Sequence, residues 1–340
     1  MTNLAALYRR DKEAVGEAFE RVMESGRYIG GQEVEDFEDR LSTHFHSNGA
    51  VGLNSGTDAL VLGLRAMDIG PRMRVGLPAL SFFSTAAAVV EIGATPVFVD
   101  TLPDRPLMDP VALQEMSCDA AILVHLFGAR CPNPLDPIPT LSDAAQCAGW
   151  GHGRPFGEAA AISFYPTKTL GAAGDAGALV SNDSKLLEKA RCLANHGHIP
   201  TKGHRFLGRN SRLDALQAAL LKVYMERLDQ RVTQRRLLAS RYEEVLGEFA
   251  LPRDPKDSVH QFVFCHPFRD RVAKTLANKG IETAIYYRRP LHQEPLFESM
   301  KACSTPNADR YTQECLAIPC HSELTESEVQ HILQSLKESI

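Results

Sequence analysis

The chain has 340 residues, of which 44% are hydrophobic, so it can bury the core of a large domain and that of a smaller one. Its formal net charge is −5 and it has no basic tail, so it lacks the excess of positive charge that is typical of nucleic-acid-binding proteins. Its most apolar stretch, residues 78–99, is broken by Ser81, Ser84, Glu91 and Pro96, which excludes a membrane-spanning helix.

Short apolar runs alternate with helical stretches from residue 50 to residue 181. This alternation is typical of an α/β fold with a mostly parallel sheet and helices on both faces. Neither an internal repeat nor a low-complexity segment interrupts it. The expected strands cover residues 50–53, 73–78, 96–100, 120–126, 140–143, 159–164 and 178–181.

The first of these strands leads into a polar turn that contains a glycine. Residues 50–60 read Ala-Val-Gly-Leu-Asn-Ser-Gly-Thr-Asp-Ala-Leu, and an apolar helix then runs to about Met67. Free amides at such a helix start point at an anion, the helix dipole favours negative charge, and Ser55 and Thr57 add hydroxyl donors. The turn therefore predicts a phosphate cup, although ordinary N-capping by Ser55 or Thr57 explains the same letters.

A carboxylate closes the expected strand at residues 140–143. Asp143 lies at the carboxyl end of that strand, and Gln146 follows three residues later. If the ligand carries a pyridine ring, a carboxylate beside the ring nitrogen keeps that nitrogen protonated and makes the ring an electron sink. An ordinary helix N-cap is the alternative interpretation of Asp143.

Lys168 is the most informative residue, because it follows the buried strand at residues 159–164 in the sequence Ser-Phe-Tyr-Pro-Thr-Lys-Thr-Leu-Gly. Open α/β sheets bind ligands at this edge, and partial desolvation there lowers the pKa of a lysine amine and frees its lone pair for imine formation. A surface lysine after a strand is the alternative. Together, the phosphate cup, the carboxylate and the lysine, in this chain order, specify pyridoxal 5'-phosphate (PLP).

The second half of the chain predicts a bridging helix and a small α/β domain. Residues 211–249 have a helical pattern with one apolar stripe, formed by Leu213, Leu216, Leu220, Tyr224 and Leu228. The expected elements that follow are strands at residues 261–265 and 282–287, a helix at residues 271–279, and a last helix opened by a capping box at residues 325–328.

These motifs resemble those of the DegT-like nucleotide-sugar aminotransferases, a branch of the fold-type I, aspartate-aminotransferase-like PLP enzymes. The resemblance covers nearly the whole chain, and so many ordered blocks make chance improbable. The matching blocks are residues 30–38, 55–60, 78–85, 93–100, 124–128, 143–146, the block around Lys168, and residues 195–197, 210–214 and 290–292.

The resemblance implies a PLP-binding large domain at residues 21–215, with a mostly parallel seven-stranded sheet. It implies an N-terminal helix at residues 1–20 that packs on the small domain, and it assigns residues 216–340 to the bridging helix and a small α/β carboxy-terminal domain. The active site is expected between the two domains and between the two subunits of a homodimer.

The resemblance also assigns roles to individual residues. Lys168 forms the imine with PLP, the internal aldimine, and shuttles the proton, while Asp143 is the partner of the pyridinium nitrogen. Gln146 contacts the ring hydroxyl side, and Phe82 stacks on the cofactor face. The residues that hold the phosphate are Gly56, Thr57, Asp58, Ser163 and the partner subunit's Asn210.

The implied reaction is a PLP-dependent transamination from an amino acid, expected to be L-glutamate, to a keto sugar attached to a nucleotide diphosphate. Amino-acid aminotransferases commonly clamp a substrate carboxylate with an arginine near the carboxyl end, but residues 316–340 contain no arginine, which fits the sugar branch. For each candidate substrate residue, a solvated or packing role is the alternative. The candidates are Arg27, Lys202 and Arg205 for the diphosphate, and Tyr28, Tyr286, Tyr287 and His292 for the sugar.

Three other functions remain open. A keto-cyclitol aminotransferase would share every cofactor residue with a sugar aminotransferase. A related PLP-dependent sugar dehydratase has histidine at the lysine position, so Lys168 argues against it. A non-catalytic PLP-binding regulatory protein would keep the fold but would show no half-transamination.

The eight cysteines are scattered without a Cys-x-x-Cys pair, so we expect free thiols in a reducing compartment. Cys315, Cys320 and His321 are better explained by a short strand after a helix than by a metal site, and we assign no metal. The first ten residues lack an apolar signal core, so we expect a cytoplasmic location.

Overall fold

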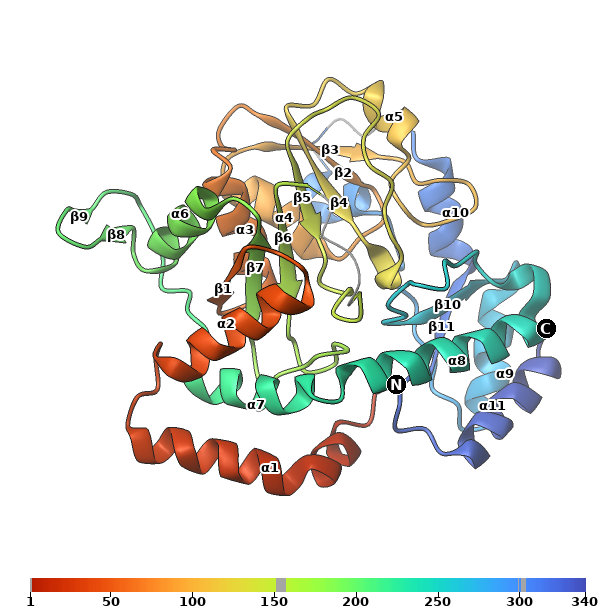
Figure 1. Ribbon diagram of the computed structural model, residues 1–340. Coiled ribbons are helices and arrows are strands. Elements are labelled where there is room, and N and C mark those ends of the chain that lie inside the picture. Colours follow the sequence, from red (N-terminus) through yellow and green to blue (C-terminus); the bar gives the residue numbers. More distant parts are fainter. Residues whose placement is uncertain (1, 151–156, 299, 301–303) are drawn as a thin grey trace.

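The computed structural model describes residues 2–150, 157–298, 300 and 304–340 (Figure 1). Its centre is a seven-stranded sheet with the strand order β1-β7-β6-β5-β4-β2-β3. β7 runs antiparallel to its neighbours β1 and β6, and the other pairs are parallel, which confirms the predicted fold class. The strands are β1 (Gly49–Leu53), β2 (Arg74–Pro78), β3 (Thr95–Val99), β4 (Ala120–Val124), β5 (Thr140–Asp143), β6 (Ala159–Ser163) and β7 (Gly177–Ser181).

Helices cover both faces of this sheet, because the side chains of each strand alternate between two cores. Ala159 and Ala161 of β6 pack with residues of α3, α4 and α6, whereas Ala160 and Ile162 pack with residues of α2 and α7. The helices of the large domain are α1 (Leu4–Ser25), α2 (Gln32–His44), α3 (Gly56–Ala66), α4 (Phe83–Glu91), α5 (Pro110–Gln114), α6 (Ser184–Ala194) and α7 (Ala215–Met225).

A smaller domain has a core of its own, on the right in Figure 1. Helices α8, α9 and α11 pack there on the antiparallel pair β10–β11. The predicted capping box at the start of α11 is present, with both reciprocal hydrogen bonds of Thr325 and Glu328. The elements are α8 (Leu228–Leu246), β10 (Phe262–Cys265), α9 (Arg269–Asn278), α10 (Pro306–Glu314), β11 (Cys315–Ile318) and α11 (Glu326–Lys337).

Two elements of this half differ from the sequence prediction. The bridging segment consists of two helices, α7 and α8, because Arg227 leaves the helical conformation with φ −112° and ψ 11°. Residues 282–287 form no strand. Only Ala284 makes a bridge to Ala317 of β11, after which the chain turns towards the sheet and brings Tyr286 and Tyr287 to a cavity.

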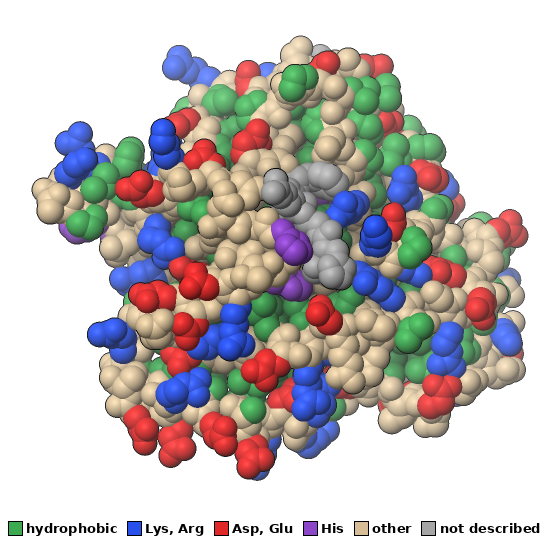
Figure 2. Space-filling model, viewed as in Figure 1, with side chains coloured by type: hydrophobic (Ala, Val, Ile, Leu, Met, Phe, Trp, Pro, Cys, Tyr) green, Lys and Arg blue, Asp and Glu red, His purple; other side chains and the backbone are tan. Residues whose placement is uncertain are grey.

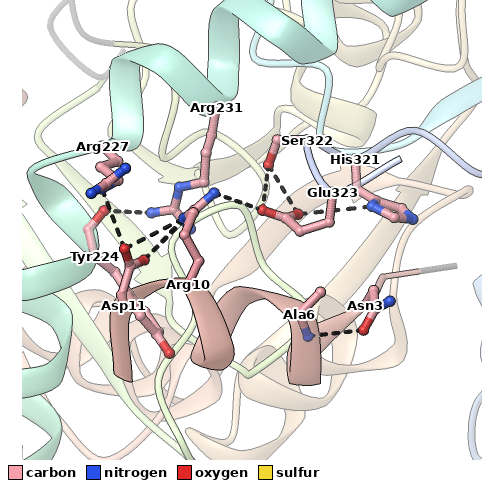
Figure 3. Close-up of polar contacts among 10 residues, drawn as sticks. All are labelled: Asn3, Ala6, Arg10, Asp11, Tyr224, Arg227, Arg231, His321, Ser322 and Glu323. Carbon is pink, nitrogen blue, oxygen red and sulfur yellow. Dashed lines mark hydrogen bonds and ion pairs between the residues drawn. The ribbon is translucent and has the colours of Figure 1, made fainter. Parts of the chain in front are cut away.

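Helix α1 lies along α7 and connects the large domain to the small one. It is kinked at the buried Asp11, whose carboxylate accepts from Arg10 and pairs with Arg227 at 3.2 Å (Figure 3). Arg10 also reaches Glu323, just before α11, at 3.1 Å. The helix is thus held by charged contacts to the bridging segment and to the small domain.

A two-stranded hairpin, β8 (His198–Ile199) and β9 (Gly203–His204), projects from the body of the subunit, at the left of Figure 1. The segment after it exposes 86% of Leu207. On the face drawn in Figure 2, acidic and basic side chains are interspersed. None of the helices in the described part of the chain is long and apolar enough to cross a membrane.

Candidate active site

A cavity of about 470 Å³ lies where the parallel strands end, between the sheet and the small domain. The large domain contributes the start of α3, the turn before α4 and the segments that follow β5 and β6. His260, Gln261, Tyr286 and Tyr287 enter from the other side. Because parallel strands share one carboxyl edge, residues from distant parts of the sequence meet here.

The start of α3 and the end of β6 form one polar corner of the cavity. Ser55 caps α3, since its hydroxyl accepts from the Asp58 amide at 3.0 Å. Thr57 donates to the Ser84 hydroxyl at 3.1 Å. A Cβ at Gly56 would lie 2.7 Å from the Ser163 Cβ, so glycine permits this close approach. The corner combines a helix N-terminus with hydroxyl groups and suits a phosphate group.

Asp143 and Lys168 lie in the same cavity and influence each other. Burial raises the pKa of Asp143, while hydrogen bonds from Thr85 and the Ala145 amide and the charge of Lys168 oppose that rise. Burial lowers the pKa of Lys168, and the charge of Asp143 opposes this shift. Burial therefore favours the neutral amine of Lys168, the form that can act as a nucleophile, whereas Asp143 favours the charged form.

Gln146 and Tyr287 form the wall next to Asp143. The Gln146 side-chain oxygen accepts from the Phe127 amide at 2.6 Å, which fixes its orientation. Burial raises the pKa of Tyr287, and a hydrogen bond with Gln146 opposes the rise. Phe82, whose ring lies 6.2 Å from that of Tyr287, is 58% exposed, so this side of the cavity is open.

Two histidines at the cavity were given no role by the sequence interpretation. His125 follows β4, and its Nδ1 accepts from the Cys131 amide at 3.1 Å. Burial lowers its pKa to about 3, so it is neutral. Its position directly after a buried strand was a usable signal.

His260 had no such signal, because only the tertiary fold brings it next to the Lys168 segment. Its ring lies 3.5 Å from the Thr169 hydroxyl, and its amide donates to the Phe127 carbonyl at 3.0 Å. Burial, together with the charges of Lys168 and Arg235, lowers its pKa well below the usual value. This histidine is therefore also neutral.

The remaining candidate residues lie outside the cavity of one subunit. Asp58 pairs with Arg209 at 2.6 Å, and its side chain does not line the cavity. His292 packs on Phe98, with ring centroids 6.0 Å apart. The candidates on the exposed surface are Arg27, Tyr28, Lys202, Arg205 and Asn210.

The groups inside the cavity fit PLP. A desolvated lysine amine can form an imine with its aldehyde, a buried carboxylate can hold a proton on its ring nitrogen, and the polar corner can take its phosphate. The donor set thus covers three chemically distinct parts of the cofactor: the aldehyde, the ring nitrogen and the phosphate.

Comparison with known proteins identifies the family. The model of the DegT/DnrJ/EryC1/StrS aminotransferase family matches residues 9–337. A dTDP-3-amino-3,4,6-trideoxy-alpha-D-glucose transaminase from Streptomyces venezuelae is 34% identical and is matched over 99% of this chain and 94% of its own length. A pleiotropic regulatory protein from Geobacillus stearothermophilus is also 34% identical, over 99% and 97%. The chain belongs to the DegT/DnrJ/EryC1/StrS aminotransferase family.

Solved structures agree with this assignment. Streptomyces venezuelae DesV in complex with a ketimine intermediate is similar with a TM-score of 0.93 and 32% identity, covering 99% of this chain and 96% of that one. NtdA from Bacillus subtilis with bound pyridoxamine phosphate (PMP) has a TM-score of 0.89 and 25% identity, covering 99% of this chain and 84% of that one. The protein is therefore a PLP-dependent aminotransferase.

Proposed function

We propose that the enzyme transfers an amino group from L-glutamate to a keto sugar attached to a nucleotide diphosphate. The main support is the substrate class in the names of the relatives, which include transaminases of dTDP-linked and UDP-linked sugars. The cavity supports the proposal, because its described wall contains no arginine that would clamp a small 2-oxo acid.

We assign tasks to the polar residues of the cavity described above. Bound PLP supplies an electron sink for the α-carbon of the amino donor. Lys168, whose pKa is lowered by burial, would serve as the base that moves the α-proton of the amino donor. Asp143 holds the proton on the ring nitrogen, and the corner formed by Ser55, Gly56 and Ser163 binds the phosphate. His125 and His260 stay neutral and therefore add no competing positive charge.

The acceptor is tested in two half-reactions. L-glutamate should first convert the bound cofactor to its amine form, and the loss of visible absorption measures this conversion. Nucleotide-linked 3-keto or 4-keto deoxysugars should then restore that absorption, whereas the free sugars should react at least about 100-fold less efficiently, because two charge-assisted contacts contribute about 1.5 to 3 kcal/mol each. Equal turnover of free keto-cyclitols or of simple 2-oxo acids would contradict the sugar assignment.

Lys202 and Arg205 are the proposed contacts of the diphosphate. They lie on the exposed β8–β9 hairpin and directly after it, where they can reach a neighbouring subunit. Arg205→Ala should raise KM for the nucleotide sugar while the glutamate half-reaction stays at its original rate. Lys185→Ala, at the exposed start of α6, is a control that should change neither.

The role of Lys168 is tested by chemical trapping. Borohydride should attach the cofactor to a peptide that contains Lys168. The variant Lys168→Ala should lose both the adduct and turnover, whereas Lys185→Ala should keep both. An adduct on another lysine would overturn the assignment.

We also propose a homodimer with composite active sites in the cytoplasm. The projecting hairpin, the exposed Leu207 and the position of Asn210 outside its own subunit's cavity support the assembly. The free thiols of the described cysteines are compatible with a reducing compartment. Analytical ultracentrifugation tests the dimer, and fractionation of cells tests the location.

The two other PLP alternatives are separable from this function. A regulatory protein without catalysis would show no glutamate half-reaction, and this matters because one relative is named as a regulatory protein. The dehydratase alternative requires histidine at position 168, where this cavity has a lysine. Conversion of the bound cofactor by glutamate alone would therefore exclude both.

A further inference from the structure

We infer that the buried hydroxyls of Ser81 and Thr85 form a relay that positions Asp143 and stabilises its negative charge. Both act through Asp143 and are therefore positioning residues. The inference rests on the proposed role of Asp143 at the ring nitrogen of PLP. Neither hydroxyl has a part in the steps described above.

The direction of the relay follows from counting protons. Thr85 is fully buried, and its Oγ1 donates to Asp143 Oδ2 at 2.9 Å. An ionised carboxylate can only accept hydrogen bonds, so the single proton of Thr85 is used there. Ser81, 3% exposed, lies with its Oγ 2.7 Å from Thr85 Oγ1 and must therefore be the donor of that bond. The chain runs from Ser81 through Thr85 to Asp143.

The local fold explains why the two hydroxyls meet. Ser81 lies in the turn after β2, and Thr85 lies in the first turn of α4, four residues later. The Thr85 amide donates to the Phe82 carbonyl at 3.1 Å, which fixes this turn. Phe82 and Ser84, between the two, line the cavity. Ser81 also lines the cavity, whereas Thr85 does not, so the relay runs from the cavity wall to the buried Thr85, at the positive end of the α4 dipole, which favours a carboxylate.

The carboxylate needs this support because it is buried. Burial raises the pKa of Asp143, and the hydrogen bond from Thr85 is the largest of the effects that oppose the rise. Among the described residues, the second oxygen of the carboxylate accepts from the Ala145 amide alone, at the longer distance of 3.3 Å. Hydrogen bonds in series also polarise one another, so Ser81 strengthens the bond made by Thr85. Without the relay, Asp143 would hold the ring proton less firmly.

The test uses variants that remove one hydroxyl at a time. Thr85→Val keeps the shape but removes the donor, Ser81→Ala removes only the outer member, and Thr85→Ser restores a hydroxyl. Thr101→Val is the matched control, because Thr101 is also fully buried and its hydroxyl has no hydrogen-bond partner within the described residues. Asp143→Asn serves as the reference for complete loss of the carboxylate.

The readout is the pH midpoint of the visible absorption of PLP-loaded enzyme, together with the dissociation constant of PLP. Thr85→Val should raise the midpoint, because a weaker positive charge on the ring makes the imine nitrogen more basic. It should weaken PLP binding and lower kcat of the glutamate half-reaction by about tenfold each, as for a lost hydrogen bond to a charged group, with KM less affected. Ser81→Ala should shift the midpoint in the same direction by less, and Thr85→Ser should reverse the effect.

The outcomes separate the relay from the role of Asp143. If Asp143→Asn raises the midpoint while Thr85→Val and Thr101→Val leave it unchanged, the relay is wrong and Asp143 keeps its role. If Asp143→Asn leaves the midpoint unchanged, both the relay and the proposed role of Asp143 at the ring nitrogen are wrong. Should Thr85→Val not fold, Ser81→Ala decides, since the relay requires an upward shift in that variant.

Discussion

At the scale of single residues, burial has opposite consequences for Asp143 and Lys168, the proposed acid and amine of the active site. Desolvation lowers the pKa of Lys168, which is useful because a nucleophile and base must be neutral. The same desolvation raises the pKa of Asp143, which is harmful to a group that must stay charged beside a pyridinium. The hydrogen bonds at Asp143 therefore preserve a charge that the cavity alone would remove.

Asp257 predicts a pH dependence of stability that is separate from catalysis. Its carboxyl group is buried near the junction of the domains, and burial raises its pKa to about 6 although the Asp254 amide donates to it at 3.0 Å. The folded state therefore binds the proton more tightly than the unfolded state does. The stabilisation is complete below about pH 4, the usual value, and is lost as pH rises through about 6.

The variant Asp257→Asn should remove this dependence. Urea unfolding between pH 4 and 7, at constant PLP and protein concentrations, should show a smaller fall of the unfolding free energy with pH than in the original protein. Asp39→Asn, at an exposed position on α2, should leave the fall unchanged. An equal fall in all three proteins would show that Asp257 titrates normally.

The sequence revealed those residues of the cavity that have a recognisable place at a strand end. Asp143 ends one buried strand and Lys168 follows another, and parallel strands bring such ends together, so their positions predicted that they share an edge. Thr85 could not be found in this way, because its importance lies in one hydrogen bond to Asp143. His260 lies in the segment before β10, far from Lys168 in the sequence. Its contact with Thr169 could therefore not be predicted.

At the scale of elements, the junction of α3 and β6 predicts a strict need for glycine at position 56. An added methyl group would lie 2.7 Å from the Ser163 Cβ, so one of the two elements would have to shift. Gly56→Ala should therefore weaken PLP binding at least about tenfold and lower stability by about 1 to 3 kcal/mol, the usual cost of overpacking. Fluorescence titration and urea unfolding measure the two effects.

Gly70→Ala is the control for this prediction, because no atom lies within 4 Å of the Cβ that it would add. It should bind PLP as the original protein does. Unchanged PLP affinity in Gly56→Ala would mean that the corner can widen without loss, and the phosphate would then depend on other contacts.

Glu323 accepts a hydrogen bond from Arg10 of α1 at 3.1 Å (Figure 3). Burial raises the pKa of this carboxyl, but the His321 ring at 3.8 Å, the hydroxyl of Ser322, which donates at 2.9 Å, and the charge of Arg10 outweigh that effect and bring the pKa to about 2. Because the folded pKa is depressed, the stabilisation is present above about pH 4.5 and is lost as pH falls towards 2. Glu323→Gln should therefore lower the unfolding free energy at pH 7 by about 1 to 3 kcal/mol.

The difference in stability between Glu323→Gln and the original protein should shrink as pH falls. Thermal unfolding at several pH values measures this difference. Glu20→Gln, on the exposed side of α1, should change stability little at any pH. A constant difference between Glu323→Gln and the original protein down to pH 2 would assign its effect to packing and not to charge.

Helices and strands were predicted well where burial produces a simple sequence pattern, and poorly where tertiary contacts determine the local conformation. Each expected strand of the sheet is present, because strands buried on both faces are apolar throughout. The apolar and aromatic run at residues 282–287 has the composition of a strand, but its two tyrosines line the cavity instead of extending a sheet. The break at Arg227 coincides with its ion pair to Asp11, which the letters of the helix do not reveal.

At the scale of the whole molecule, we propose that one subunit builds only part of the active site. The cavity contains the groups for the ring, the aldehyde and one side of the phosphate, whereas Arg27, Lys202, Arg205 and Asn210 lie outside it on the exposed surface. The side next to Phe82 is open. A second copy of the chain, placed so that its hairpin and Asn210 reach this opening, would complete the site.

This arrangement predicts complementation between two defective chains. Lys168→Ala removes the amine, and Asn210→Asp places a negative charge where the partner's phosphate is expected, so each homodimer should be nearly inactive. Random mixing makes half of the dimers heterodimers, and one of the two sites in each heterodimer combines an intact lysine with an intact asparagine. Activity should therefore return to about a quarter of that of the original protein, as expected for a symmetric dimer with shared sites.

The matched control mixes Lys168→Ala with Asp143→Asn. Both changes fall in the cavity of the same subunit, so no heterodimer site is intact and activity should stay at the level of the separate variants. Recovery in the first mixture and none in the second would establish that the asparagine acts across the interface. If neither mixture recovers although mass spectrometry detects the heterodimer, each subunit carries its complete site, and Asn210 has no role in its partner's catalysis.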